Sequence, residues 1–115
     1  MDRMEELKQV QRAFAAERDW DQFHSPKNLA MALAVEASEI MEILQWLTEG
    51  ESQALSPEQH AHMQDEIGDV MNYLTRLADR LGIDPLDAAL QKDAKNRLKY
   101  PVVRAKGKSE KYDNL

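Results

Sequence analysis

Three pairs of residues, each a helix cap followed by a proline, divide the chain into helices. They are Ser25–Pro26, Ser56–Pro57 and Asp84–Pro85. Serine and aspartate cap helix N-termini, and the fixed φ of proline suits the first helical position. Apolar residues at helical spacing follow each pair and also occupy residues 2–18, whereas no segment alternates like a strand. The sequence therefore predicts an all-α protein with helices at about residues 2–18, 25–49, 56–81 and 84–100.

The ends of these helices are also marked, and the connections between them are short. Gly50 and Gly82 are expected to end the second and third helices, and Pro101 disfavours helix at the residue before it. Short connections favour antiparallel neighbours, so we expect a four-helix bundle. We predict one domain over residues 1–103 and a basic tail over residues 104–115. A chain of 115 residues buries only roughly 65 % of its unfolded surface, so a homo-oligomer, dimer or tetramer, is expected.

Charge and composition exclude several classes of protein. Residues 1–91 hold 7 Lys/Arg and 18 Asp/Glu, whereas residues 92–115 hold 8 and 3. An acidic body argues against a nucleic-acid partner, which would need a basic face. The absence of cysteine excludes disulfides and thiolate metal sites. No apolar run is long enough to span a membrane, and the N-terminus is too charged for a signal peptide, so we expect a cytoplasmic protein without a membrane partner.

Two pairs of carboxylates lie in or beside the apolar stripes of the second and third helices. Glu36 falls within the stripe of the second helix, and Glu39 lies 60° away on its border, at 100° per residue. Glu66 and Asp69 follow one edge of the stripe of the third helix. Each pair has (i, i+3) spacing, which places both side chains on the same side of its helix. The stripes themselves are interpreted as core: Leu29, Leu33, Ile40, Ile43, Leu44 and Leu47 in the second helix, Met63, Ile67, Val70, Leu74, Leu77 and Leu81 in the third, with Phe14 of the first helix.

Four carboxylates that converge between antiparallel helices must either take protons or bind cations. Oxygen ligands without cysteine favour Mg²⁺, with Mn²⁺ as a substitute. A di-iron carboxylate bundle is a rival interpretation, but it needs Glu-x-x-His motifs, which His24, His60 and His62 do not supply. The other alternative is a non-enzymatic helical interaction or oligomerisation module, in which the acidic edges only interact with water.

The two acidic motifs, Glu36-x-x-Glu39 and Glu66-x-x-Asp69, are similar to the metal motif of the MazG-like, all-α nucleoside triphosphate pyrophosphohydrolases. The segments ERDWDQFHSPKNL (17–29), EILQW (42–46), KDAKNRLKYP (92–101) and KYDNL (111–115) resemble the dCTP pyrophosphatase branch of that family. The resemblance covers nearly the whole chain. Two departures are Val35 before Glu36, where the family often has a second glutamate, and Gln11, which aligns with a histidine of animal members.

The resemblance implies hydrolysis of a nucleoside triphosphate between the α and β phosphates, which releases a monophosphate and pyrophosphate. It implies Mg²⁺ held by Glu36, Glu39, Glu66 and Asp69, and a homo-oligomer whose sites take residues from more than one chain. We expect Glu39 to orient the attacking water. The substrate expected first is dCTP or a modified dCTP, and related pyrophosphohydrolases that act on dUTP or phosphoribosyl-ATP are alternatives.

The same resemblance assigns residues to the phosphates and to the base. Lys92, Asn96 and Arg97 are the phosphate-binding candidates, although Arg97 points away from the other two on a helical wheel. Lys111 and Tyr112 in the tail are expected to close over the site. The candidates for binding the base are Trp20, His24, Asn28, Trp46 and Tyr73.

Overall fold

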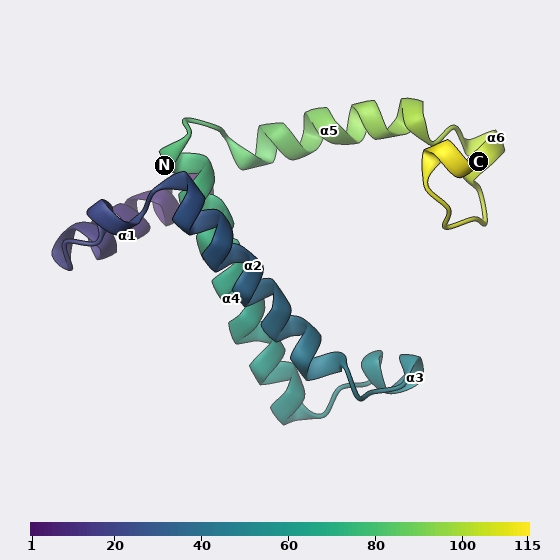
Figure 1. Ribbon diagram of the computed structural model, residues 1–115, viewed down its shortest axis with the longest axis horizontal. Helices are drawn as coiled ribbons and strands as arrows, with labels where there is room; N and C mark the ends of the chain where they lie inside the picture. The colour runs from purple at the N-terminus through teal and green to yellow at the C-terminus, as the bar shows by residue number, and fades with distance from the viewer. The chain divides into compact units, whose positions relative to one another are not determined.

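The computed structural model describes all 115 residues, and all of its regular structure is helical, which confirms the predicted class (Figure 1). The chain divides into two compact units, Met1–Ile83 and Asp84–Leu115. The elements, in chain order, are α1 Arg3–Glu17, the 3₁₀ helix η1 Asp21–Phe23, α2 Pro26–Leu44, α3 Glu49–Ser52, α4 Pro57–Arg80, α5 Pro85–Lys99, α6 Val102–Ala105 and the 3₁₀ helix η2 Tyr112–Asn114.

The three predicted cap–proline starts are confirmed. The Ser25 hydroxyl accepts a hydrogen bond from the Asn28 N–H at 3.2 Å, and Asp84 accepts two bonds from the first turn of α5. Ser56 forms a reciprocal capping box with Gln59. Each cap satisfies N–H groups that the first turn of a helix leaves free, so the sequence specifies these starts locally.

The predicted end of the second helix at Glu49 is wrong, because α2 ends at Leu44. The chain starts a new helix at Thr48, whose hydroxyl accepts from the Glu51 N–H at 3.1 Å while the Glu51 carboxylate accepts from the Thr48 N–H at 2.9 Å. This second capping box favours a short separate helix, α3. Gly50 therefore lies inside α3 and is not the left-handed residue that ends α2, whereas Gly82 does end α4, with φ of 68°.

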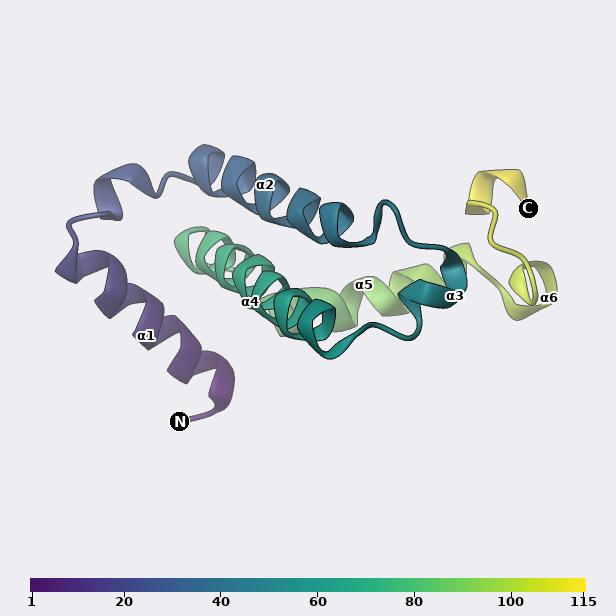
Figure 2. The same ribbon diagram turned by 90° about the horizontal axis from the view of Figure 1, so that it is seen from below.

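In the first unit, α2 runs antiparallel along α4, and α1 also contacts α4 (Figures 1 and 2). The buried apolar residues are few: Ala15, Leu29 and Ala78. The buried residues of α4 are mainly polar, because Glu66, Thr75 and Arg76 are all less than 9 % exposed. At 100° per residue, Glu66, Thr75 and Arg76 point to different sides of α4, so this helix packs buried polar side chains on more than one side.

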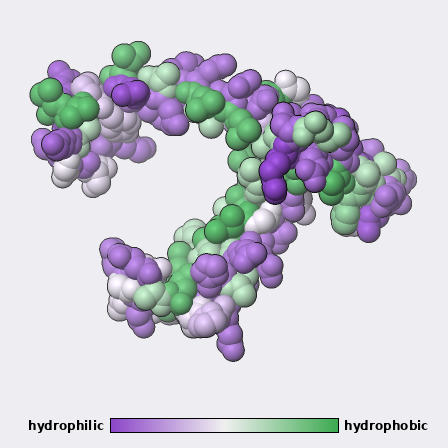
Figure 3. Space-filling view, turned by 180° about the vertical axis from the view of Figure 1, so that it is seen from behind, coloured by the Kyte–Doolittle hydropathy of each residue, from purple (hydrophilic) through white to green (hydrophobic).

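The stripes interpreted as core are only partly buried within one chain. Ile67 is 55 % exposed, Leu74 41 % and Leu81 52 %, and Phe14 is 47 % exposed. The core interpretation is therefore wrong for these residues in the single chain. On α4, the side that meets α2 carries Glu66, and Ile67 lies 100° round the helix from it. Figure 3 shows apolar side chains at the surface along the α2–α4 pair. Such a continuous apolar surface is unusual for a monomer.

The second unit has regular structure in the basic tail, where the 3₁₀ helix η2 spans Tyr112–Asn114. Tyr112 of η2 packs edge-on against Tyr100, with ring centroids 6.1 Å apart. The Lys99 ammonium lies 4.9 Å from the centre of the Tyr112 ring. The tail therefore contacts the end of α5. The boundary predicted between residues 103 and 104 stays a prediction.

None of the helices in either unit combines the length and the apolar character that crossing a bilayer requires.

The two glycines give a matched test of these helix ends. Gly82→Ala should lower the free energy of unfolding by about 1 kcal/mol, because alanine is strained at positive φ. Gly50→Ala should leave it unchanged or raise it by about 0.5 kcal/mol, since this glycine is helical and an added Cβ would meet its nearest atom at 4.0 Å. Urea unfolding of both variants measures the difference, and an equal effect at the two positions would contradict the observed end of α2.

Candidate active site

Three carboxylates from two facing helices form a compact acidic cluster. Glu36 and Glu39 project from α2, and Glu66 projects from α4; one oxygen from each lies within 4.8 Å of the others. The (i, i+3) spacing on α2 and the antiparallel packing on α4 together produce this convergence. The structure thus brings together three of the four residues predicted as metal ligands.

Burial and mutual repulsion make this cluster unfavourable when all three groups are ionised. Glu66 is 8 % exposed, and one oxygen of Glu66 and one of Glu36 are buried without a hydrogen-bond partner. The pKa of Glu66 is raised to about 7, first by a hydrogen bond with Glu39 that the protonated form makes, then by burial and by repulsion from Glu39 and Glu36. The pKa of Glu36 is raised as well, chiefly by burial and by Glu39.

The donor set of this cluster fits a hard divalent cation. Buried carboxylate oxygens without partners are the atoms that a cation would satisfy, and oxygen ligands without cysteine favour Mg²⁺ or Mn²⁺. The His62 ring also approaches the cluster, with Nε2 3.5 Å from the Glu66 carboxylate. Sequence reasoning missed this contact, although the (i, i+4) spacing of His62 and Glu66 on one helix was a signal for it.

Asp69 connects the acidic cluster to an aromatic pocket. It lies one turn after Glu66, contributes to the repulsion that raises the pKa of Glu36, and lines a pocket of about 300 Å³. The pocket brings together three of the residues predicted to bind the base, Trp20, His24 and Tyr73. Six more lining residues complete it: Val10, Gln11, Phe14, Asp69, Asn72 and Arg76.

The end of α1 places Trp20 in this pocket. Asp19 has a left-handed backbone with φ of 54°, and the Trp20 N–H bonds back to the Ala15 carbonyl at 2.9 Å, so the helix ends in a Schellman motif. The Trp20 ring then packs edge-on against Phe14, with centroids 5.6 Å apart, and against His24 at 6.2 Å. The turn after α1 therefore builds one wall of the pocket from two of the residues predicted to bind the base, Trp20 and His24.

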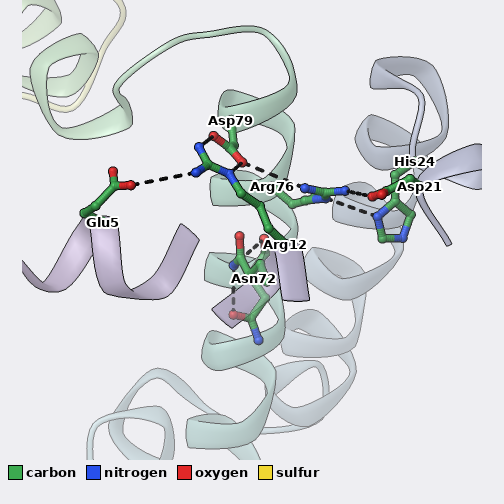
Figure 4. Close-up of polar contacts among 8 residues, drawn as sticks. Glu5, Arg12, Asp21, His24, Asn72, Arg76 and Asp79 are labelled. Carbon is green, nitrogen blue, oxygen red and sulfur yellow. Dashed lines mark hydrogen bonds and ion pairs between the residues drawn. The ribbon is translucent and has the colours of Figure 1, made fainter. Parts of the chain in front are cut away.

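Polar side chains of α1 and α4 also line the pocket or lie next to its lining residues, and they contact one another (Figure 4). Gln11 donates through Nε2 to the backbone oxygen and the side-chain oxygen of Asn72, both at 3.1 Å. Arg76 donates to the His24 ring and to Asp21, and Arg12 forms a forked ion pair with Asp79. Sequence reasoning missed Asn72 and Arg76, because a helical pattern does not show which polar side chains bond to distant segments of the chain.

The structure does not bring Trp46 to this pocket within one chain. Because α2 ends early, Trp46 lies beyond the helix and is 87 % exposed. Asn28 does not line the pocket, and its side chain instead donates to the Phe23 carbonyl at 3.0 Å, which connects η1 to the start of α2.

The phosphate-binding candidates Lys92, Asn96 and Arg97 all lie on α5, in the second unit. The pKa of Lys92 is lowered, first by Lys99 and also by Lys95. Lys95 and Lys99 lie three and seven residues after Lys92, so the three ammonium groups share one face of α5.

The chain is an all-α protein that holds a carboxylate cluster beside an aromatic pocket, and the comparisons specify its family. Residues 31–115 match the model of the MazG-like family. The human protein dCTP pyrophosphatase 1 is 44 % identical over 97 % of this chain and 67 % of its own length, and its bovine counterpart is 42 % identical over 97 % and 68 %. The chain belongs to the MazG-like family, as the sequence motifs predicted.

A solved structure supports the fold independently. The crystal structure of a pyrophosphatase from Archaeoglobus fulgidus superposes with a TM-score of 0.83 at 37 % identity. The match covers 88 % of this chain and 94 % of the archaeal chain, so the similarity extends over most of both proteins.

The raised pKa of Glu66 predicts how stability depends on pH without metal. Folding strengthens proton binding at Glu66, so its contribution to stability is present below the ordinary pKa of 4.5 and is lost as pH rises through about 7. In EDTA, the melting temperature of the wild type should fall between pH 5.5 and 8 by more than that of Glu66→Gln. Mg²⁺ should raise the wild-type melting temperature more at pH 8 than at pH 5.5. Parallel pH curves for the two proteins would contradict this electrostatic account.

Proposed function

We propose that this protein is a Mg²⁺-dependent nucleoside triphosphate pyrophosphohydrolase that cleaves dCTP, or a modified dCTP, to the monophosphate and pyrophosphate. The observation that carries the proposal is the joining of the acidic cluster and the aromatic pocket through Asp69. The similarity to proteins named dCTP pyrophosphatase 1, over almost the whole chain, supports the choice of substrate.

Glu36, Glu39, Glu66 and Asp69 would hold the metal in this proposal. Held by these four carboxylates, the metal would supply positive charge that offsets the charge of the triphosphate and of the leaving pyrophosphate. Of the three clustered carboxylates, Glu39 is the one for which we propose a second role, that of orienting the water that attacks the α-phosphorus. It lies at the border of the α2 stripe and is only partly buried, so solvent reaches it.

The pocket would hold the base. The rings of Trp20 and Tyr73 offer stacking surfaces, and stacking on an aromatic side chain is worth roughly 1–3 kcal/mol per base without selecting among bases. Selection must come from polar groups that the wrong base leaves unpaired. His24, Gln11 and Asn72 are the polar groups of the pocket wall suited to this selection, and Asn28 supports the segment that carries His24.

Lys92, Asn96 and Arg97 are proposed to bind the phosphates, with Lys111 and Tyr112 closing over them. The mutual repulsion of the α5 lysines supports this, since a bound anion would relieve it. Tyr112 already contacts the end of the same helix through Tyr100 and Lys99.

The exposed apolar face of α4 supports a homo-oligomer, a dimer or tetramer. Ile67, Leu74 and Leu81 would be covered by another copy of the chain. The exposed position of Trp46 is consistent with a site that takes residues from more than one chain, as in the predicted assembly.

A panel of nucleoside triphosphates tests the reaction. With Mg²⁺, dCTP should be hydrolysed with pyrophosphate as the first product and with a higher kcat/KM than dUTP or the purine triphosphates. Chromatography of the products, together with separate assays for pyrophosphate and orthophosphate, measures both points. Orthophosphate as the first product would refute the bond assignment, and a purine that exceeds dCTP would refute the base assignment.

Two glutamates of α2 give a matched test of the metal site. Glu36→Gln removes a proposed ligand of the metal. Loss of a group that only orients a ligand costs roughly 10–100-fold, so we expect a larger fall in kcat/KM for Glu36→Gln. Its metal-free form should melt no lower than wild type, since repulsion in the cluster is relieved. Glu42→Gln makes the same change on an exposed residue of the same helix and should leave activity unchanged. Near-normal activity in Glu36→Gln would refute the proposed ligand.

Light scattering tests the proposed assembly. At micromolar concentration the mass should be two or four times the 13.2 kDa of one chain. Ile67→Glu should lower it, because a charge cannot be buried in an apolar contact without a large cost. Gln64→Glu, one turn earlier on α4 at an exposed position, should not. A wild-type mass of 13.2 kDa would contradict the proposal.

A further inference from the structure

Arg76 is a buried charge whose partners come from two different parts of the fold. Arg76 is only 6 % exposed, and an isolated charge at so buried a position would be strongly unfavourable. Its guanidinium donates to the Asp21 carboxylate and, through Nε, to Nδ1 of His24 at 3.2 Å; it also lies 3.8 Å from Asp79. Asp21 and His24 are more than 50 positions away in the sequence, in the segment between α1 and α2.

Every charged group of this network has a partner of opposite charge, and Glu5 lies 3.8 Å from Arg12 at its edge. Asp79 accepts a forked ion pair from Arg12 at 2.6 and 2.8 Å, which lowers the pKa of its carboxyl. Two arginines therefore meet two aspartates, and Figure 4 shows the four side chains with His24 in one continuous set of contacts between α1, α4 and the intervening segment. The network needs no further ligand, so its effect is to hold these elements together.

Arg76 also lines the pocket, so the contacts that it makes affect the shape of the pocket. Arg76 lies three residues after Tyr73 and seven after Asp69, spacings that place all three on one face of the helix, and all three line the pocket. The segment that Arg76 holds carries Trp20 and His24, which line the same pocket. One guanidinium thus connects the helix that carries acidic residues to the segment that carries the aromatic wall.

The hydrogen bond from Arg76 also determines which nitrogen of His24 carries a proton. A guanidinium can only donate, so Nδ1 of His24 must accept and be unprotonated. The neutral ring then carries its proton on Nε2. Burial first, and then the charge of Arg76, lowers the pKa of His24, whereas Asp21 raises it and Arg80 lowers it further. His24 is therefore neutral near pH 7, with one defined hydrogen-bond donor.

We propose that Arg76 is a positioning residue of the nucleoside pocket, which fixes His24 as the Nε2–H tautomer and holds the Trp20–His24 wall against α4. A pocket wall with a defined donor recognises an acceptor atom of the base, such as a ring nitrogen or carbonyl oxygen. This inference rests on the proposed function for the identity of the ligand, but the tautomer and the attachment do not depend on it.

The tautomer is tested in the wild-type protein without substrate. The imidazole nitrogens of ¹⁵N-labelled protein are observed by NMR at pH 7.5, and the signals of His24 are identified by their loss in His24→Gln. Only two other histidines contribute to the spectrum, His60 and His62. A protonated Nε2 and an unprotonated Nδ1 are expected. A proton on Nδ1, or a doubly protonated ring, would overturn the proposal whether or not the protein hydrolyses nucleotides.

Kinetics test the positioning role. Arg76→Lys keeps the charge but replaces the fork with a single ammonium, which cannot hold His24, Asp21 and Asp79 together. We expect the KM for dCTP to rise about tenfold and kcat to stay within about twofold, since the loss is in binding that is common to ground and transition states. Arg80→Lys makes the same change one turn later, at an exposed residue, and should alter neither constant. An unchanged KM in folded Arg76→Lys would overturn the positioning role.

A second variant tests the same role at a more exposed position, where the substitution disturbs folding less. Asp21→Asn removes the negative charge that pairs with the Arg76 guanidinium, at a side chain that is half exposed. We expect this variant also to raise KM, by a smaller factor than Arg76→Lys. Loss of kcat at constant KM in both variants would indicate a purely structural role and would contradict the proposal. A wild-type protein that cleaves no nucleoside triphosphate would refute the proposed function, and the NMR result would then decide the tautomer by itself.

Discussion

The close approach of three carboxylates between α2 and α4 is the constraint on which the rest of the site depends. Glu36, Glu39 and Glu66 meet within 4.8 Å, two of their oxygens are buried without a partner, and the pKa of Glu66 rises to about 7 as a result. Packing of the two helices forces this contact, and repulsion opposes it. A bound cation would remove the repulsion, so metal binding and the stability of the α2–α4 pair are linked.

The parts of α4 around Glu66 and around Arg76 differ in whether their charged groups have partners. Around Glu66 the charges have one sign and lack partners, whereas around Arg76 two arginines balance two aspartates. The two residues are about 15 Å apart along the helix, at 1.5 Å per residue. The pocket that contains Asp69 and Tyr73 lies between them. We therefore interpret the part around Glu66 as the one that binds a ligand and the part around Arg76 as the one that fixes the pocket.

Local signals in the sequence predicted much of this arrangement. Ser25, Ser56 and Asp84 specified three helix starts because a cap acts on its own first turn. Glu36 in an apolar stripe indicated the acidic cluster, and the surrounding motifs indicated the family. Among the expected base-binding residues, Trp20, His24 and Tyr73 do meet in one pocket.

The predictions were wrong or incomplete where two local structures compete for the same residues, or where the structure depends on contacts between residues far apart in the sequence. The end of α2 at Leu44 depends on the capping box of Thr48 and Glu51, which competes with continuation of the helix toward Gly50. The exposure of Ile67 and Leu74 could not be predicted, because their apolar pattern indicates a face to be covered but not the chain that covers it. Arg76 was missed for a related reason, since its hydrogen-bond partners Asp21 and His24 are more than 50 residues away.

Proton release on metal binding tests the central interpretation most directly. Isothermal titration of Mg²⁺ into the protein at pH 6, in two buffers with different enthalpies of ionisation, gives the number of protons released per metal bound. Because Glu66 has a pKa of about 7 without metal, it is mostly protonated at pH 6 and must lose its proton to bind a cation. We predict release of a large fraction of one proton, which disappears in Glu66→Gln. Mg²⁺ binding with the same heat in both buffers, or no binding at all, would contradict the account of the acidic cluster as a metal site.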